Sequence, residues 1–342
     1  MGLVAQRDLD AVAKGVVGWL ASHRGSLEVT SCERPSEGLS SETILCHVRD
    51  RDSSTPETIV VRLPPLGDGA FPTYDLAAQA AAQNLTAARG LPVPAPVELV
   101  VDEQWLGSPF LVMPAIPGHV PGGVAVHDAW IRESPPNLQR HLYEAFIDQL
   151  AAVHEVDVDV ATLGIPERGV DAELAYWRRY LDWYADGEVV VPALDDALTW
   201  CAEHRPPVDP PPALLWGDVR LGNVIFDESR TPVAILDWEM TTIGAPEHDV
   251  AWWRSLEAIQ DEFFGRRVDG FPSLDEALRI YEQHLGRPLE HLDWFEVFAM
   301  VRSTAIMTRL AVLNERVGNP GLFPIAANPI LPLIDRRIEA AS

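Results

Sequence analysis

Hydrophobic positions repeat at two spacings along this chain, and its first part mixes helical and strand-like patterns. Near the start, apolar residues recur at helical spacing with polar residues between them: Leu9, Val12, Val16, Val17 and Leu20. Short apolar runs bounded by turn-forming residues then predict three strands, a helix and two further strands: 27–32, 43–49, 59–63, 74–88, 97–101 and 110–113. Spacings near 3.6 and 2 residues are typical of helix and strand faces. The first part is therefore expected to form a small sheet with few helices.

From about residue 137 onward the spacing becomes mainly helical. One apolar stripe ends at His154, and further stripes predict five more helices: 172–184, 193–204, 248–264, 274–285 and 292–314. On the last of these, Arg302 lies within the apolar stripe. Because a buried charge needs a partner, we expect Arg302 to pair with Asp249 or Glu247.

Two prolines and a glycine separate the two patterns, in the run Met113-Pro114-Ala115-Ile116-Pro117-Gly118. Such a run favours a stiff connector over a helix or a strand. A chain of 342 residues is also long enough for two hydrophobic cores. We therefore predict an α+β protein with an N-terminal lobe at 1–113, a hinge at 114–118 and a larger, mainly helical C-terminal lobe at 119–342.

One motif in the C-terminal part has the spacing of a phosphoryl-transfer site. The run Trp216-Gly217-Asp218-Val219-Arg220-Leu221-Gly222-Asn223 presents an acid and, five residues later, an amide. Two short apolar runs, 224–226 and 233–236, predict a hairpin that brings Asp237 back beside them. In such sites one acid accepts the hydroxyl proton of the substrate, while the amide and the second acid hold Mg²⁺ at the ATP phosphates. The motif predicts an ATP-dependent small-molecule kinase, with Asp218 as base and Asn223 and Asp237 as metal ligands.

Two neighbouring side chains have more than one interpretation. Glu239, two residues beyond Asp237, is either a further metal contact or a side chain that faces away. Arg220, between Asp218 and Asn223, either contacts the transferred phosphate, neutralises Asp218 or pairs with an acid at the surface.

These segments resemble the aminoglycoside phosphotransferase-like family, whose members share a two-lobed protein-kinase-like fold and a His-Gly-Asp-x-x-x-x-Asn loop. The chain is also similar to the branch of kinase-like domains fused to acyl-CoA dehydrogenases. That similarity rests on four segments: Arg220-Leu221-Gly222-Asn223, Leu236-Asp237-Trp238-Glu239, Gly244-Ala245-Pro246 and Asp249-Val250-Ala251-Trp252. The resemblance covers nearly the whole chain and implies ATP and Mg²⁺ as cofactors.

The resemblance implies a phosphate-binding role for the N-terminal lobe. The family's Gly-x-Ser-x-x-Thr loop stands here as Gly38-Leu39-Ser40-Ser41-Glu42-Thr43, so Ser40, Ser41 and Thr43 are expected at the phosphates. Arg62 stands where the family has a phosphate-pairing lysine or arginine. Lys14 is the only lysine in the sequence, which favours Arg62 for this role.

The same resemblance implies partners for Arg62 and for the adenine ring. Family members orient the phosphate-pairing cation with an acid on the following helix; here Asp75 and Gln79 are the candidates, with Gln79 better placed. In the hinge, backbone groups of Met113 and Ala115 are expected to contact the adenine edge.

Trp216 departs from the family, in which a histidine most often precedes the Gly-Asp pair. A buried indole can organise the loop by packing and by one N–H donor, so we expect Trp216 to do so. The alternative to an enzyme is a module of the same fold that binds nucleotide without transferring phosphate. Trp216, Arg62 and Gln79 favour that alternative, whereas retention of the three acid and amide residues opposes it.

Composition narrows the classes of partner. A formal net charge of −25 excludes nucleic acid and anionic membranes as expected partners, because both require a basic surface. Residues beyond 118 contain 18 basic and 37 acidic side chains, a net −19, which either attracts a cationic acceptor or only keeps the protein dissolved. The phosphoryl acceptor is a small molecule with a hydroxyl group; an amino sugar, a sugar and a hydroxyacyl compound all remain open.

The sequence also predicts a cytoplasmic protein. The three cysteines, Cys32, Cys46 and Cys201, share no metal-binding or redox spacing, so reduced thiols are expected. No apolar run is long enough to span a membrane, and the first helix lacks the features of a signal peptide. The sequence predicts no oligomeric state.

Overall fold

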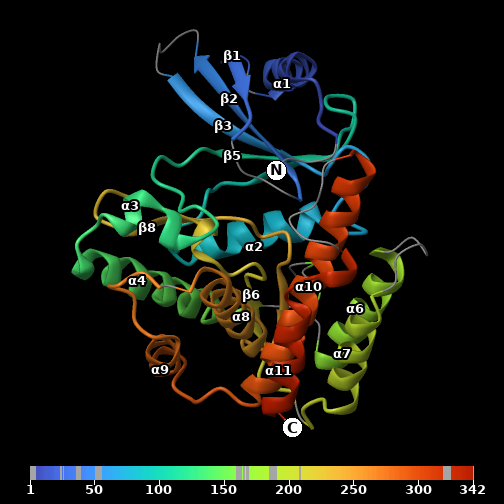
Figure 1. Ribbon diagram of the computed structural model, residues 1–342. Helices are drawn as coiled ribbons and strands as arrows, with labels where there is room; N and C mark the ends of the chain where they lie inside the picture. Colours follow the sequence, from blue (N-terminus) through green and yellow to red (C-terminus); the bar gives the residue numbers. More distant parts are fainter. Residues whose placement is uncertain are drawn as a thin grey trace.

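A five-stranded antiparallel sheet forms the first lobe of the computed structural model (Figure 1). Its strands, in the spatial order β1-β2-β3-β5-β4, are β1 (Leu27–Glu33), β2 (Glu42–Asp50), β3 (Pro56–Leu63), β4 (Glu98–Val100) and β5 (Phe110–Pro114). The structure describes residues 5–23, 25, 27–35, 40–50, 56–158, 164, 166, 169–184, 191–207, 209–265, 267–318 and 325–341. Along β3, side chains alternate between buried and partly exposed, which is the period-2 pattern from which the strand was predicted.

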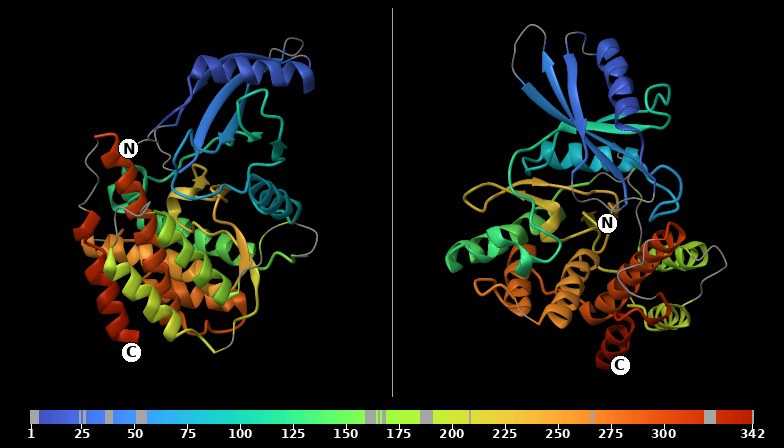
Figure 2. Two further views of the ribbon diagram at one scale, coloured as in Figure 1. Left: turned by 90° about the vertical axis from the view of Figure 1, so that its right-hand side faces the viewer. Right: turned by 45° about the horizontal axis from the view of Figure 1, so that its top comes forward.

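Helix α1 (Leu9–His23) covers one face of this sheet (Figure 2). Val12, Val16 and Leu20 are buried there as expected, but Val17 is 44% exposed and Trp19 is buried instead. The expectation for Val17 was wrong because neighbouring helical residues point about 100° apart, whereas Trp19 lies one turn from Val16 on the same face.

Helix α2 (Leu76–Ala88) lies against the other face of the sheet and also contacts the helical lobe (Figure 2). Leu76 and Ala80 pack in a small cluster with Leu111 and Met113 of β5. Other α2 side chains, such as Ala82, belong to the core of the helical lobe. The helix therefore connects the two hydrophobic cores.

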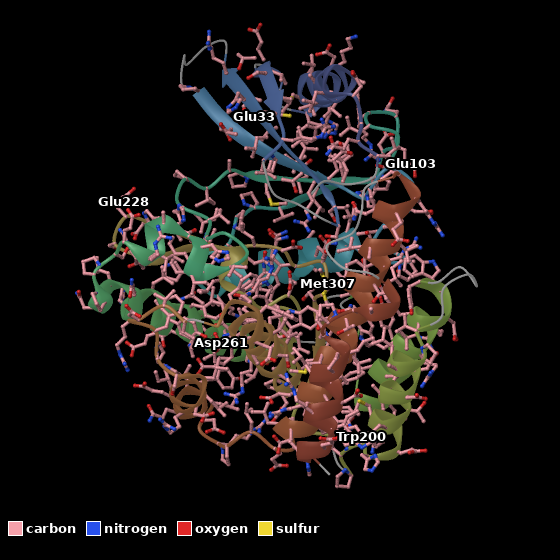
Figure 3. All side chains as sticks on the ribbon, in the orientation of Figure 1. Glu33, Glu103, Trp200, Glu228, Asp261 and Met307 are labelled. Carbon is pink, nitrogen blue, oxygen red and sulfur yellow. The ribbon has the colours of Figure 1, made fainter. Side chains whose placement is uncertain are left out.

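The second lobe is mainly helical. Its helices are α3 (Ala129–Arg132), α4 (Pro136–His154), α6 (Val170–Tyr184), α7 (Pro192–Glu203), α8 (Glu247–Phe264), α9 (Leu274–Leu285), α10 (Leu292–Arg316) and α11 (Leu331–Ala341), with 3-10 turns η1 (Ala125–His127), η2 (Leu221–Asn223) and η3 (Ile325–Ala327). Helix α10 packs against α6, α7, α8 and α11, and side chains fill the space around it (Figures 1 and 3). The six helices predicted here are present, whereas α3 and α11 were not predicted.

Four short strands frame the loops of the C-terminal motif. β7 (Val224–Phe226) and β8 (Pro232–Ile235) form the predicted hairpin. β6 (Ala213–Leu215) pairs with β9 (Thr242–Gly244), a pairing that was not predicted. Two three-residue strands separated by 26 residues give no alternating pattern long enough to recognise.

The structure brings two of the three cysteines together, which their sequence spacing did not indicate. Cys32 and Cys46 are directly opposite each other on β1 and β2, and their sulfur atoms are in contact. Both are free thiols, as is Cys201 in α7. Across the helices that the structure describes, none combines the length and apolar character needed to cross a membrane.

Candidate active site

The loop after β6 turns sharply at Gly217. This residue has φ +97°, and a Cβ atom added to it would lie 2.5 Å from the Met240 carbonyl oxygen. Both facts favour glycine, since side chains strain a left-handed backbone and no space is left for a methyl group. Gly217 therefore allows the chain to change direction directly before Asp218.

Asp249, in the first turn of α8, fixes the backbone of this loop. Its Oδ2 accepts a hydrogen bond from the Trp216 N–H at 2.7 Å, and its Oδ1 accepts one from the Gly217 N–H at 3.0 Å. Oδ2 also accepts a hydrogen bond from His154 Nε2 at 3.1 Å, and His154 Nδ1 is hydrogen-bonded to the Tyr281 hydroxyl group at 2.6 Å. All of these groups are buried. The sequence predicted Asp249 as a partner of Arg302, and its clamp on the loop backbone was missed.

Trp216 has the organising contacts expected of it. Its side chain is fully buried, and its indole Nε1–H donates to the Leu236 carbonyl oxygen at 2.7 Å. The acceptor lies directly before Asp237, so the indole joins the loop of Asp218 to the end of the hairpin. One packed ring with one N–H donor thus performs the structural task predicted for it.

The Asp218 carboxylate accepts hydrogen bonds from three side chains. Its Oδ2 accepts from Asn223 Nδ2 at 2.7 Å and from Arg220 Nε at 3.1 Å. Its Oδ1 accepts from the indole Nε1–H of Trp252 at 3.0 Å. Of the alternatives for Arg220, the structure shows the pairing with Asp218. The contact from Trp252 is additional, because Trp252 was not among the predicted site residues.

Asn223 and Asp237 are held next to each other through the backbone. The Leu236 N–H donates to the Asn223 carbonyl oxygen at 2.8 Å, so the hairpin returns the chain to the amide just before Asp237. The side-chain Nδ2 of Asn223 donates to the carbonyl oxygen and to Oδ2 of Asp218, so its Oδ1 is the side-chain atom left to accept other contacts. Asp237 has φ +59°, a conformation that presents its carboxylate on a tight turn.

Arg62 and Glu239 connect this site to the N-terminal lobe. Arg62 Nη2 pairs with Asp237 Oδ1 and, at 3.1 Å, with Glu239 Oε2. Glu239 also accepts the hydroxyl protons of Ser40 and Ser41, the latter at 2.8 Å. Burial and, after it, the nearby Asp237 charge raise the pKa of Glu239 to about 7. Glu239 thus faces the site, and the open alternative that it points away is excluded.

The remaining predicted positions of the phosphate loop are only partly described. Thr43 lies opposite Arg62 in the β2–β3 ladder, beside Ser40 and Ser41 in sequence. Gly38 and Leu39 lie outside the residues that the structure describes.

The expected partners of Arg62 on α2 do not reach it. Gln79 is buried, and its side-chain Nε2 has no hydrogen-bond partner. Asp75 instead caps α2 by accepting the Ala78 N–H at 2.9 Å. The expectation was wrong because the guanidinium extends to Asp237 and Glu239, whereas Asp75 bonds only within the first turn of α2 and the Gln79 Nε2 has no partner.

In the hinge, hydrogen bonds within the sheet limit which backbone groups can contact adenine. Strand β5 runs through Met113 and ends at Pro114, so the first hinge residue belongs to the sheet. The Ala115 N–H donates to the Thr58 carbonyl oxygen at 3.0 Å and is not available to adenine. Met113 packs its side chain between β5 and α2. Met113 is directly opposite Val60, two residues along the ladder from the Thr58–Ala115 bond, so its backbone N–H and C=O groups bond to β3. Of the expected contacts, the carbonyl group of Ala115 stays a candidate for the adenine edge.

The oxygen atoms of Asn223, Asp237 and Glu239 fit Mg²⁺ rather than a soft metal. Within the described part of the chain, no three His, Cys, Asp or Glu side chains gather into a metal cluster. Mg²⁺ does not need one, because it keeps several waters and takes only one or two carboxylates beside substrate phosphates. One amide and two carboxylates are such a ligand set.

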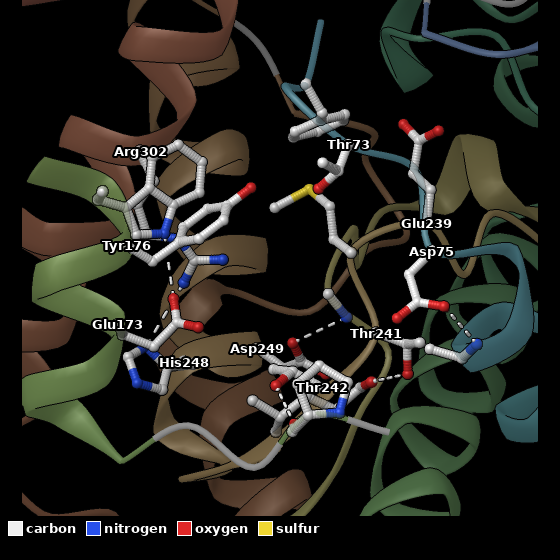
Figure 4. Close-up of a pocket in the computed structure, with 17 residues that line it drawn as sticks. Thr73, Asp75, Glu173, Tyr176, Glu239, Thr241, Thr242, His248, Asp249 and Arg302 are labelled. Atoms are coloured by element: carbon white, nitrogen blue, oxygen red, sulfur yellow. Dashed lines mark hydrogen bonds between the residues drawn. The ribbon is translucent and has the colours of Figure 1, made fainter. Parts of the chain in front are cut away.

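A cavity of about 210 Å³ adjoins the catalytic loop (Figure 4). It borders Gly217 and Glu239 on the side of the motif, and Thr73 and Asp75 from the segment directly before α2 also line it. Further lining residues come from α6, β9, α8 and α10: Glu173, Tyr176, Trp177, Thr242, His248, Asp249 and Arg302. Its lining includes Gly217, the residue directly before Asp218, so the cavity lies next to the loop that presents this acid.

Arg302 lines this cavity but does not make the expected ion pair. Its guanidinium lies over the rings of Trp177 and Trp252, 5.4 and 5.1 Å from their centres, and Nη1 is 3.4 Å from His248 Nδ1. The expectation was wrong because Asp249 is used by the loop backbone, and Glu247 pairs with Arg287 at 2.7 Å. Burial, and then the Arg302 charge, lower the pKa of His248 to about 4.

Comparison with known families gives one match that covers most of the chain. The model described as "APH: Phosphotransferase enzyme family" matches residues 31–281. Acyl-CoA dehydrogenase family member 11 of Gallus gallus is 30% identical over 271 residues, which are 73% of this chain and 33% of that protein. Member 10 of Mus musculus is 26% identical over 314 residues, 87% of this chain and 28% of that protein. The chain therefore spans about a third or less of the length of these relatives.

Solved structures show the same fold. A presumed aminoglycoside phosphotransferase from Ralstonia eutropha superposes with TM-score 0.68 and 22% identity, covering 98% of each chain. Macrolide 2'-phosphotransferase MphH from Brachybacterium faecium superposes with TM-score 0.53 and 19% identity, covering 90% of this chain and 98% of its own. The predicted α+β, kinase-like fold is confirmed by these likenesses.

Proposed function

The chain belongs to the phosphotransferase enzyme family, and from this premise we propose that it moves the terminal phosphoryl group of ATP to a hydroxyl group of a small molecule. The observation that supports the proposal most strongly is the meeting of Asp218, Asn223 and Asp237. Asp218 and Asn223 share a 2.7 Å hydrogen bond, and a backbone bond brings the hairpin end beside Asn223. The candidate base and the candidate metal ligands are thus neighbours, and a cavity of about 210 Å³ borders Gly217 beside them.

Asp218 acts as the base in this proposal. The acceptor hydroxyl donates a hydrogen bond to its carboxylate and transfers its proton there as the oxygen bonds to the γ-phosphorus. The bond from that phosphorus to the bridging oxygen breaks, and ADP leaves with the electron pair. Arg220, 3.1 Å from the same carboxylate, keeps a positive charge beside the reacting groups.

The other residues position ATP and its metal. Bound Mg²⁺ would neutralise charge on the phosphates, held by Asn223 Oδ1, Asp237 and Glu239. Arg62 and the loop of Ser40, Ser41 and Thr43 would contact phosphate oxygens in place of their present contacts with the acids. The carbonyl group of Ala115 would contact adenine.

The acceptor fits the cavity beside Gly217. Relatives named for aminoglycosides, macrolides and acyl-CoA dehydrogenases suggest amino sugars, sugars and hydroxyacyl thioesters as test compounds. The cavity has both carboxylates and the Arg302 guanidinium in its lining, so no single charge class is favoured.

A nucleotide-binding module without transfer is the second candidate. It is favoured by Arg62, whose contacts are with Asp237 and Glu239 rather than with a dedicated acid on α2. The intact Asp218 and its donors count against it, because a module that only binds nucleotide has no use for an oriented base.

A transfer screen with γ-labelled ATP and Mg²⁺ tests the proposal. The protein is incubated with panels of amino sugars, sugars and hydroxyacyl thioesters, and Asp218→Asn is run beside it. We expect at least one compound to take the label with the wild type only. Labelling that is equal in both proteins contradicts the role of Asp218, and nucleotide binding without any label transfer, even to water, supports the second candidate.

A further inference from the structure

Two adjacent tryptophans of α8 direct their indole N–H groups to different partners. Trp252 donates to Asp218 Oδ1 at 3.0 Å, and Trp253 donates to the Tyr143 hydroxyl at 3.0 Å. Both rings are buried, with 4% and 1% of their surface exposed. Only Trp252 therefore touches the loop of the catalytic motif through its polar atom.

The position of Trp252 follows from the geometry of α8. Asp249 and Trp252 are three residues apart, so they lie on the same face of the helix. Asp249 fixes the backbone of the loop at Trp216 and Gly217, and Trp252 contacts the carboxylate that the loop presents. One helical turn thus controls both the path of the loop and the orientation of its acid.

The hydrogen bonds on the Asp218 carboxylate leave few sites for an acceptor hydroxyl group. A carboxylate has about four lone-pair sites, two on each oxygen. On Oδ2, Asn223 and Arg220 occupy both, whereas on Oδ1 Trp252 occupies one. The place left for an incoming hydroxyl group is on Oδ1, and the Trp252 N–H determines its direction.

The ring of Trp252 also has a fixed neighbour in the acceptor cavity. The Arg302 guanidinium lies 5.1 Å from its centre, within the range of a cation–π contact, and Arg302 lines the cavity. Arg302 therefore joins the cavity lining to Trp252, and the indole of Trp252 contacts Asp218.

We propose that Trp252 is a positioning residue, which turns Oδ1 of Asp218 toward the acceptor hydroxyl and is itself held in place by Arg302. The proposal rests on the function proposed above. In the sequence Trp252 stands out only as the last residue of the segment Asp249-Val250-Ala251-Trp252, and the proposal gives it a role that connects the lining of the cavity to Asp218.

Replacement of Trp252 by phenylalanine isolates the N–H donor. Trp252→Phe keeps a ring beside Arg302 but leaves Oδ1 without its donor. With MgATP hydrolysis as the assay, we expect kcat to fall about tenfold or more and KM for ATP to change by less than about twofold, because a hydrogen bond to a charged group is lost away from the nucleotide. Trp253→Phe is the matched control, since it removes an equally buried indole donor one residue away, and we expect its kcat to stay within about threefold of wild type.

The contact itself is tested without nucleotide. In ¹⁵N-tryptophan-labelled protein, the Trp252 indole resonance is assigned by its loss in Trp252→Phe. We expect Asp218→Ala to move this resonance and to leave that of Trp253 in place. If the Trp252 indole resonance has the same position in Asp218→Ala as in the wild type, the proposal is wrong, regardless of the measured rates.

The two measurements separate the possible failures. If the resonance responds but Trp252→Phe and Trp253→Phe have equal rates, the contact exists and the positioning role is wrong. If the resonance responds but the wild type neither hydrolyses MgATP nor labels an acceptor, the proposed function fails, and the catalytic role of Trp252 fails with it.

Discussion

At the residue scale, Arg62 is the cation that the N-terminal lobe offers to the site. The only lysine, Lys14, is exposed on α1, which covers the far face of the sheet from α2. A guanidinium can contact two acids or two phosphate oxygens at once, whereas an ammonium group is a point charge on a flexible chain. The exchange of Arg62 for lysine therefore changes geometry while it conserves charge.

We predict that Arg62→Lys weakens MgATP binding about tenfold, the expected cost of one charge-assisted hydrogen bond. Titration calorimetry of the purified protein measures the effect. Arg49→Lys is the control, because Arg49 is exposed on the neighbouring strand β2. Equal affinities of the two variants would remove Arg62 from the phosphate site.

His248 gives the fold a defined dependence on pH. Its pKa is about 4 in the folded protein, against an ordinary value of 6.5, because burial and then Arg302 disfavour its cationic form. Below about pH 6.5 His248 binds a proton in the unfolded chain, whereas in the folded chain it binds that proton only below about pH 4. Stability is therefore fully present above pH 6.5 and falls as the pH decreases through this window, by on the order of 3 kcal/mol in total.

The variant His248→Asn tests this effect. We predict that its free energy of unfolding, measured with urea at several pH values, decreases less steeply between about pH 6.5 and 4 than that of the wild type. The comparison is of slopes, so a constant loss of stability in the variant does not matter. His204→Asn, at an exposed position after α7, should keep the wild-type slope. Parallel curves for His248→Asn and wild type would contradict the assignment.

At this scale the sequence predicted well where spacing was enough. Asp218 and Asn223 are five residues apart on one loop, and a hairpin returns Asp237, so their meeting follows from local geometry. Asp249 and Trp252 could not be placed in the same way, because their contacts with the loop depend on how α8 packs against it. Their chemical roles, like those of the other site residues, stay predictions.

At the scale of elements, the sharp turn between β6 and Asp218 is the most demanding feature. We predict that Gly217→Ala lowers the free energy of unfolding by about 2 to 5 kcal/mol, because the φ of +97° is strained for alanine and the added methyl group would meet the Met240 carbonyl oxygen. Urea denaturation measures the loss.

The control for this variant is Gly265→Ala, at the end of α8. Gly265 has φ +61°, but no atom lies within 4 Å of an added Cβ. The free energy of unfolding of Gly265→Ala should therefore fall by only about 1 to 2 kcal/mol, from backbone strain alone. If both variants lose the same amount, close packing at Gly217 is not what requires the glycine.

Predicted elements agree with the structure where the apolar pattern is long. The strands of the sheet and the helices from α4 to α10 have such patterns, and their ends differ from the prediction by a few residues. Strands β6 and β9, which pair with each other, and the four-residue helix α3 are too short for an apolar period to appear. Cys32 and Cys46 are neighbours because of the register of β1 and β2, which their spacing in the sequence does not indicate.

At the scale of the whole molecule, the two lobes share buried groups. Arg309 of α10 is buried and donates to the carbonyl oxygens of Gly69 and Tyr184 at 3.1 and 3.2 Å, so the long helix is tied to the segment that precedes α2. Ala78 and Ala82 of α2 belong to the large helical core, although they precede residue 113. The lobe boundary expected at 113 stays a prediction, and the packing places the start of α2 between the lobes.

The site lies where these parts meet. Arg62 of β3 and the hydroxyl groups of Ser40 and Ser41, directly before β2, contact Glu239 of the helical lobe. Nucleotide bound there would contact both lobes and would add to their stability in proportion to its affinity. Binding and chemistry can therefore be measured separately on the whole protein.

The most direct test of the central claim compares wild type and Asp218→Asn in two assays with ATP and Mg²⁺. We predict that MgATP raises the melting temperature of both proteins equally, because Asp218 is assigned no part in holding the nucleotide, and that the variant hydrolyses MgATP about 100-fold or more slowly. If the two proteins hydrolyse MgATP at the same rate, Asp218 is not the base and the account is wrong.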